Sequence, residues 1–136
     1  MLIINTKNMN NRVIHFDLYA DDPMRASKFY SEAFGWEFKK WEGEGMDYWL
    51  IMTGPKTEPG IDGGMSKREK EWANNISNGA VTIGVDDIDM AISRVEKAGG
   101  EITMKKMALP KVGWFASFKD PEGNVLALMQ TDMDAI

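Results

Sequence analysis

An internal repeat constrains the fold of this chain more than any other feature of its sequence. When the sequence is shifted by 65 positions against itself, Asp22 falls on Asp87 and Gly35 falls on Gly100. Each aspartate precedes a segment with helical periodicity and each glycine follows one, so equivalent residues stand at equivalent structural signals. The chain is therefore predicted to contain two copies of one structural unit.

The first copy is predicted to be a strand, a helix and three further strands. Residues 13–20 are expected to form the first strand, and Asp22 before Pro23 is typical of a helix start, because the carboxylate caps free amides and proline fits the first turn. Apolar side chains then recur at three- and four-residue spacing until Gly35 ends the helix. Further strands are expected at residues 36–41, 46–52 and about 60–65.

The second copy repeats this order. Residues 80–85 are predicted to be a strand, Asp87 a helix cap, and the two glycines at 99 and 100 the end of an apolar helical stripe. Strands are expected at residues 101–107, 113–119 and 125–130, with the turn DPEGN at 120–124 closing the last hairpin.

Each copy is therefore a βαβββ module, and the chain is predicted to be a single α+β domain. Module one covers about residues 12–65, module two about 78–131, and a polar linker about 66–77, with a helical turn near 68–72. Neither module covers both faces of its sheet, so the helices are expected outside a curled mixed sheet whose other side forms a cleft.

Composition excludes several classes of function. The chain has no cysteine, which excludes disulfides, cysteine-ligated metal centres and thiol nucleophiles, and a single histidine, His15. Its net charge of -5 and the lack of a basic run argue against a nucleic-acid partner. No apolar segment reaches the length of a membrane span or signal peptide, so we expect no membrane partner and a cytoplasmic location.

Three segments carry a resemblance to a known family. They are HFDLYADDPMRASKFYSEAFGWEF at 15–38, VDDIDMAISRVEKAGG at 85–100 and VGWFASFKDPEGNVLALMQ at 112–130. The chain resembles the vicinal oxygen chelate superfamily, with the glyoxalase/bleomycin resistance/dioxygenase fold, and most of all its small glyoxalase-like proteins of unassigned substrate. The resemblance implies paired βαβββ modules, a cleft between curled sheets and a homodimer, but it does not fix the reaction.

The resemblance also implies where a metal ion would bind, because active members place ligands on the first and last strand of each module. The matching positions are His15 and Asp62 in module one, and Ala80 and Ala127 in module two. The two alanines donate no lone pair, and a divalent ion usually needs three or more protein ligands. We therefore expect no complete metal site and no cofactor, with a metal on His15 and Asp62 as the disfavoured alternative.

Strand alternation indicates which side chains share the cleft with His15. Phe16 and Leu18 are expected to face the helix, which leaves His15, Asp17 and Tyr19 on the opposite face. The carboxylate of Asp17 either orients His15 as a general base or forms a purely structural pair with it. Further candidates for ligand contact, each with core or interface packing as the alternative, are Tyr19, Tyr48, Trp49, Thr82, Trp114 and Met129.

Three functions remain open. The first is a protein of the bleomycin-resistance kind that binds a small organic or antibiotic-like molecule without metal. The second is a glyoxalase-like lyase or isomerase that acts on a vicinal-oxygen substrate, with a metal on His15 and Asp62 or with His15 alone as base. The third is an interaction module without a small ligand.

Overall fold

The computed structural model describes residues 11–43, 47–69 and 79–136. The chain divides into two compact units, one centred on residues 15–79 and the other on residues 80–136. The division differs from the predicted modules at residues 12–14, which group with the second unit. Most of the helical turn expected near residues 68–72 lies outside the described residues. No helix of the described part is long and apolar enough to cross a membrane.

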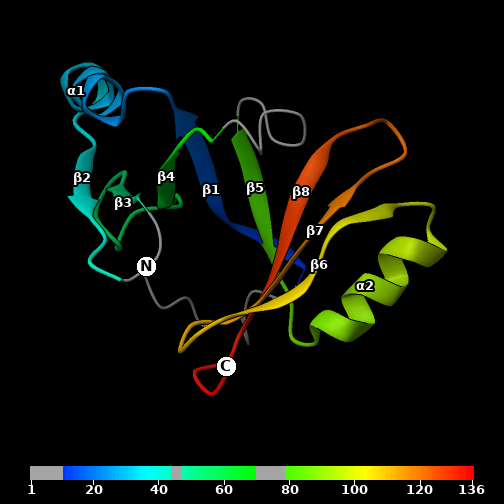
Figure 1. Ribbon diagram of the computed structural model, residues 1–136. Coiled ribbons are helices and arrows are strands. Elements are labelled where there is room, and N and C mark those ends of the chain that lie inside the picture. Colours follow the sequence, from blue (N-terminus) through cyan, green and yellow to red (C-terminus); the bar gives the residue numbers. More distant parts are fainter. Residues whose placement is uncertain (1–10, 44–46, 70–78) are drawn as a thin grey trace. The chain divides into compact units, whose positions relative to one another are not determined.

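Module one has the predicted βαβββ order. Its sheet runs in the order β2-β3-β4-β1, with β1 parallel to β4 and the other two pairs antiparallel, so it is a mixed sheet (Figure 1). The last strand reaches two residues into the segment expected as linker. The elements are β1 (Arg12–Ala20), α1 (Pro23–Phe34), β2 (Glu37–Lys40), β3 (Tyr48–Met52) and β4 (Gly63–Lys67).

The helix of module one begins and ends where the sequence predicts. The side chain of Asp22 accepts a hydrogen bond from the backbone N–H of Arg25 at 3.1 Å, and Pro23 is the first helical residue. Gly35 ends the helix with a φ of 75°, a left-handed conformation that glycine adopts without strain. One face of the helix packs on the sheet, where Ala26 joins Phe16 and Leu18 around a core centred on Ala20, Ile51 and Met65.

Module two repeats the architecture. Its sheet has the order β5-β8-β7-β6, with β5 parallel to β8 and the other pairs antiparallel. The side chain of Asp87 caps α2 by accepting from the N–H of Met90 at 3.1 Å, and the helix packs on a core of Val85, Ile88, Ala116 and Leu128. The elements are β5 (Gly79–Gly84), α2 (Ile88–Lys97), β6 (Glu101–Leu109), β7 (Gly113–Lys119) and β8 (Val125–Thr131).

The DPEGN turn closes the hairpin of β7 and β8, as predicted. The carboxylate of Asp120 accepts from the backbone N–H groups of Glu122 and Asn124 at 2.8 and 2.9 Å, and from the Asn124 side chain at 2.8 Å. These bonds lower the pKa of Asp120, the side-chain bond to Asn124 contributing most. A charged Asp120 therefore stabilises the turn that joins β7 to β8.

Candidate functional site

The polar side chains of module one meet on the sheet face that points away from α1. Phe16 and Leu18 pack toward the helix, so His15 and Asp17 project from the opposite face. The Nε2 atom of His15 lies 3.0 Å from the hydroxyl oxygen of Tyr48 and 3.4 Å from Oδ1 of Asp17. The Tyr48 hydroxyl in turn donates to Oδ1 of Asp17 at 2.9 Å. We call His15, Asp17 and Tyr48 the polar cluster.

Two members of the polar cluster are buried, whereas the side chain of Asp17 is 19% exposed. His15 is 6% exposed and Tyr48 is 4% exposed. Burial raises the pKa of the Tyr48 hydroxyl, and the negative charge of Asp17 raises it further, so the phenol keeps its proton. Within the described part of the chain, Nδ1 of His15 is buried and has no hydrogen-bond partner. The cluster therefore contains one buried polar atom to which no described residue forms a hydrogen bond.

Tyr19 lies two positions after Asp17 on the same strand and shares its alternation. Its hydroxyl is kept protonated, because burial raises its pKa and the charge of Asp17 acts in the same direction. The backbone carbonyl of Tyr19 accepts from Nη2 of Arg68 at 3.1 Å, which ties the end of β1 to the end of β4. The prediction that Tyr19 contacts a ligand stays a prediction.

The strand register corrects one of the predicted ligand positions. In module two Thr82 pairs with Ala127, and in module one Asp17, the repeat equivalent of Thr82, pairs with Gly64. The counterpart of Ala127 is therefore Gly64, and the assignment of Asp62 to this position is wrong by two residues. The carboxylate of Asp62 instead accepts from the backbone N–H and the hydroxyl of Thr53, at 2.8 and 3.3 Å.

The phenol of Tyr48 lies directly over Gly64. A Cβ atom built on Gly64 would overlap the hydroxyl oxygen and Cζ of Tyr48. Tyr48, which bonds to His15, therefore fills the space that a side chain at position 64 would occupy. No sequence signal marks Tyr48 for this role, because its contact with Gly64 depends on the pairing of β3 with β4.

In module two the predicted cleft-facing residues lie on the sheet face opposite α2. Leu128 packs toward the helix, so its neighbours Ala127 and Met129 point to the other face, where they are 5% and 4% exposed. Thr82, paired with Ala127, is 2% exposed. Near them Ser117 shares a hydrogen bond of 2.7 Å with Thr103. Ligand contact by Thr82 and Met129 stays a prediction.

The two tryptophans expected to line the cleft lie instead on the helix side of their sheets. Trp49 follows Tyr48 in β3, so it points to the opposite face and packs on the core below α1. Trp114 packs in the same way on the core below α2. The ammonium groups of Lys40 and Lys106 lie over the rings, 4.0 and 4.6 Å from the ring centroids. These contacts match the packing alternative for both tryptophans.

The described side chains do not fit a metal ion of the kind that the resemblance implies. Of the positions on the first and last strands, His15 alone carries a donor atom, whereas Gly64, Ala80 and Ala127 carry none. Within residues 11–43, 47–69 and 79–136, no group of three or more His, Asp or Glu side chains is arranged to hold a metal.

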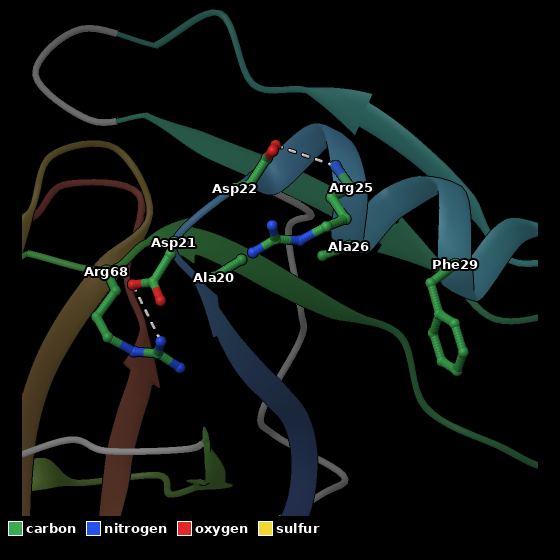
Figure 2. A pocket seen from close by; sticks show the side chains of 7 residues that line it. All are labelled: Ala20, Asp21, Asp22, Arg25, Ala26, Phe29 and Arg68. Carbon is green, nitrogen blue, oxygen red and sulfur yellow. Dashed lines mark hydrogen bonds and ion pairs between the residues drawn. The ribbon is translucent and has the colours of Figure 1, made fainter.

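A groove at the start of α1 was not predicted from the sequence. It has a volume of about 380 Å³ and lies at the carboxyl end of β1. Figure 2 shows Arg68 reaching Asp21, an ion pair of 3.1 Å, and Asp22 capping the helix. Two acidic and two basic side chains line it, and Figure 2 shows Phe29 apart from them, farther along α1. Its lining residues are Ala20, Asp21, Asp22, Arg25, Ala26, Phe29 and Arg68.

Comparison with known proteins agrees with this architecture. The family model described as "Glyoxalase/Bleomycin resistance protein/Dioxygenase superfamily" matches residues 12–128. A glyoxylase-like domain-containing protein of Didymella fabae is 32% identical over 88% of this chain and 94% of its own length. A probable lactoylglutathione lyase of Vibrio parahaemolyticus is 29% identical over 89% of this chain and 91% of its own length.

A solved structure shows the same fold. The superfamily member from Vibrio splendidus 12B01 has a TM-score of 0.61 and 19% identity, covering 88% of this chain and 97% of that one. The likeness extends over both βαβββ modules, in agreement with the order of elements described above. The chain belongs to the glyoxalase/bleomycin resistance protein/dioxygenase superfamily.

Proposed function

We propose that this protein binds a small organic molecule at the polar cluster of module one without a resident metal ion. The observation that carries the proposal is the position of Tyr48. Its phenol fills the space above Gly64 and bonds to Nε2 of His15, the one family ligand position that still carries a donor atom. The imidazole at that position is thus already hydrogen-bonded within the chain, which supports a site without a metal.

The chemistry of the cluster suits an organic ligand. A binding site of this kind needs a few fixed polar groups within an apolar surrounding, so that they set the orientation of the ligand. His15 and Tyr48 are buried and held by mutual hydrogen bonds, and Asp17 supplies a negative charge beside them. Since His15 is 6% exposed, a ligand that reaches the imidazole must enter together with a movement of neighbouring side chains.

The alternative is a metal-dependent lyase or isomerase of the glyoxalase type. It is supported by the relative named as a probable lactoylglutathione lyase, which aligns over 91% of its length. Against it stands the donor set, because Gly64 offers no side chain and Asp62 is hydrogen-bonded to Thr53. A homodimer and a cytoplasmic location accompany either function as further parts of the proposal.

A thermal-shift screen tests the proposal. The protein is purified without a histidine tag, treated with EDTA and screened against metabolites and antibiotics. A true ligand at about 100 times its dissociation constant stabilises the fold by about 2.7 kcal/mol. The proposal expects at least one organic compound to raise the melting temperature of the wild type but not that of a folded His15→Ala variant.

The control variant is Tyr30→Phe, which removes a phenolic hydroxyl from α1, outside the polar cluster. It should retain the response of the wild type. A compound that stabilises wild type and His15→Ala equally would place the site elsewhere. Stabilisation by divalent metals, lost in His15→Ala, would support the lyase or isomerase instead. A screen without any hit would favour the interaction module.

A further inference from the structure

We infer that Tyr48 holds His15 in the tautomer with hydrogen on Nε2, so that Nδ1 offers its lone pair to the ligand, and that this ligand carries an O–H or N–H group. The part about the ligand rests on the proposed function. The part about the tautomer stands on the hydrogen bonds alone. Tyr48 is in this account a positioning residue, and His15 is the residue that contacts the ligand.

The direction of the hydrogen bonds follows from the donors and acceptors present. An ionised carboxylate such as Asp17 only accepts, so the Tyr48 hydroxyl, 2.9 Å away, must donate its single hydrogen to it. Toward His15, at 3.0 Å, the same oxygen then has only lone pairs to offer. Nε2 must therefore carry a hydrogen. The raised pKa of the buried phenol agrees with this order, because it keeps the tyrosine in its donating form.

The order of the bonds leaves Nδ1 of the neutral imidazole as an acceptor. This atom is buried and unpaired within the described residues, and a buried acceptor without a partner costs free energy. A ligand with a hydroxyl or amide N–H removes this penalty by donating a hydrogen bond to Nδ1. A ligand of the same shape with only ether or carbonyl oxygens does not, so the cluster selects for hydrogen-bond donors.

The tautomer is measured by NMR on the full chain labelled with ¹⁵N at histidine. The chain has one histidine, so the signals need no assignment. Long-range ¹H–¹⁵N correlations, recorded after EDTA treatment under alkaline conditions at which imidazole is neutral, distinguish the two tautomers. The wild type should show the Nε2–H form. Tyr48→Phe, which removes the fixed acceptor, should show a mixture, whereas Tyr30→Phe should match the wild type.

A second variant keeps the inference open to refutation if Tyr48→Phe does not fold. Asp17→Ala removes the acceptor of the tyrosine hydrogen, which can then point at Nε2 and move the imidazole toward the Nδ1–H form. An Nδ1–H form in the wild type would overturn the inference. So would an unchanged Nε2–H form in every folded variant, because the tautomer would then not depend on the polar cluster.

The class of ligand is tested with phenol and anisole, which differ by one O–H donor. Phenol should shift the Nδ1 resonance of the wild type and bind about tenfold or more tightly than anisole, because anisole leaves Nδ1 unpaired. Equal binding of both probes, or no shift at saturating phenol, would refute the donor requirement. The tautomer result needs no ligand, so it would stand even if the screen for an organic ligand failed.

Discussion

Replacement of Gly64 by alanine should destabilise the protein through an overlap with Tyr48. Gly64 does not adopt a left-handed φ, so alanine fits its backbone and adds no conformational strain there. The new methyl group would overlap the hydroxyl oxygen and Cζ of Tyr48. The phenol must then move away, and its bonds to His15 and Asp17, of 3.0 and 2.9 Å, are lost.

The expected cost is about 3–5 kcal/mol. Each lost hydrogen bond contributes about 1 kcal/mol, and overpacking of a well-filled site contributes about 1–3 kcal/mol. Folded domains have unfolding free energies of about 5–15 kcal/mol, so the variant should remain folded but lose a large part of its free energy of unfolding. For a chain of this length the melting temperature should fall by about 10–20 °C.

Urea unfolding followed by tryptophan fluorescence measures the effect. The matched control is Gly54→Ala, because nothing lies within 4 Å of a Cβ at Gly54 and its φ is also not left-handed. Gly54→Ala should change the free energy of unfolding by less than about 1 kcal/mol. In a Tyr48→Phe background the cost of Gly64→Ala should shrink by about 1 kcal/mol or more, since the hydroxyl is already gone. Equal stability of Gly64→Ala and Gly54→Ala would refute the packing of Tyr48 over Gly64.

Three further changes test other parts of the structure. Tyr48→Phe should lower the free energy of unfolding by about 1–3 kcal/mol, because it leaves buried partners unpaired, whereas Tyr30→Phe should cost far less in the same urea titration. Asp120→Asn should lower the urea midpoint near pH 7 but not in acid. The pKa of Asp120 in the folded protein lies below its ordinary value of 3.8, so its charged form stabilises the fold above that value. This stabilisation is lost as the pH falls through the folded pKa. A midpoint difference that persists in acid would contradict the role of its charge. Asp87→Ala should cost about 1 kcal/mol by removing the cap of α2, and an unchanged melting temperature would refute the capping role.

The local elements of the fold were predictable from the sequence because their signals are local. Asp22 and Asp87 cap the helices that they precede, and Gly35 ends the first helix in the left-handed conformation. Strand alternation correctly separated His15 from Phe16 in β1. These outcomes depend on residues a few positions apart, so one sequence is enough to predict them.

The candidate site depends on pairing between strands that are distant in the sequence, and one prediction that depended on this pairing was wrong. The connection from Met52 to Gly63 is longer than the turn from Lys119 to Val125. A constant shift of 65 residues therefore does not align the last strands of the two modules. For this reason Asp62 was assigned to the position that Gly64 occupies.

The aromatic residues of β3 illustrate a second limit. Tyr48 and Trp49 were both candidates for ligand contact, yet adjacent residues of a strand point to opposite faces. The structure places Tyr48 beside His15 and Trp49 in the core below α1. The shift by 65 residues aligned Trp49 with Trp114, and both pack on the core on the helix side of their sheets.

Equilibrium dialysis against zinc and nickel tests the central claim most directly. The tag-free wild type and a His15→Ala variant are dialysed against each ion, and the bound metal is determined by elemental analysis. Because His15 is the single donor at the family ligand positions, we expect substoichiometric metal that is the same in both proteins. A stoichiometric metal ion in the wild type that is lost in His15→Ala would contradict the claim that the network of Tyr48, His15 and Asp17 takes the place of a metal site.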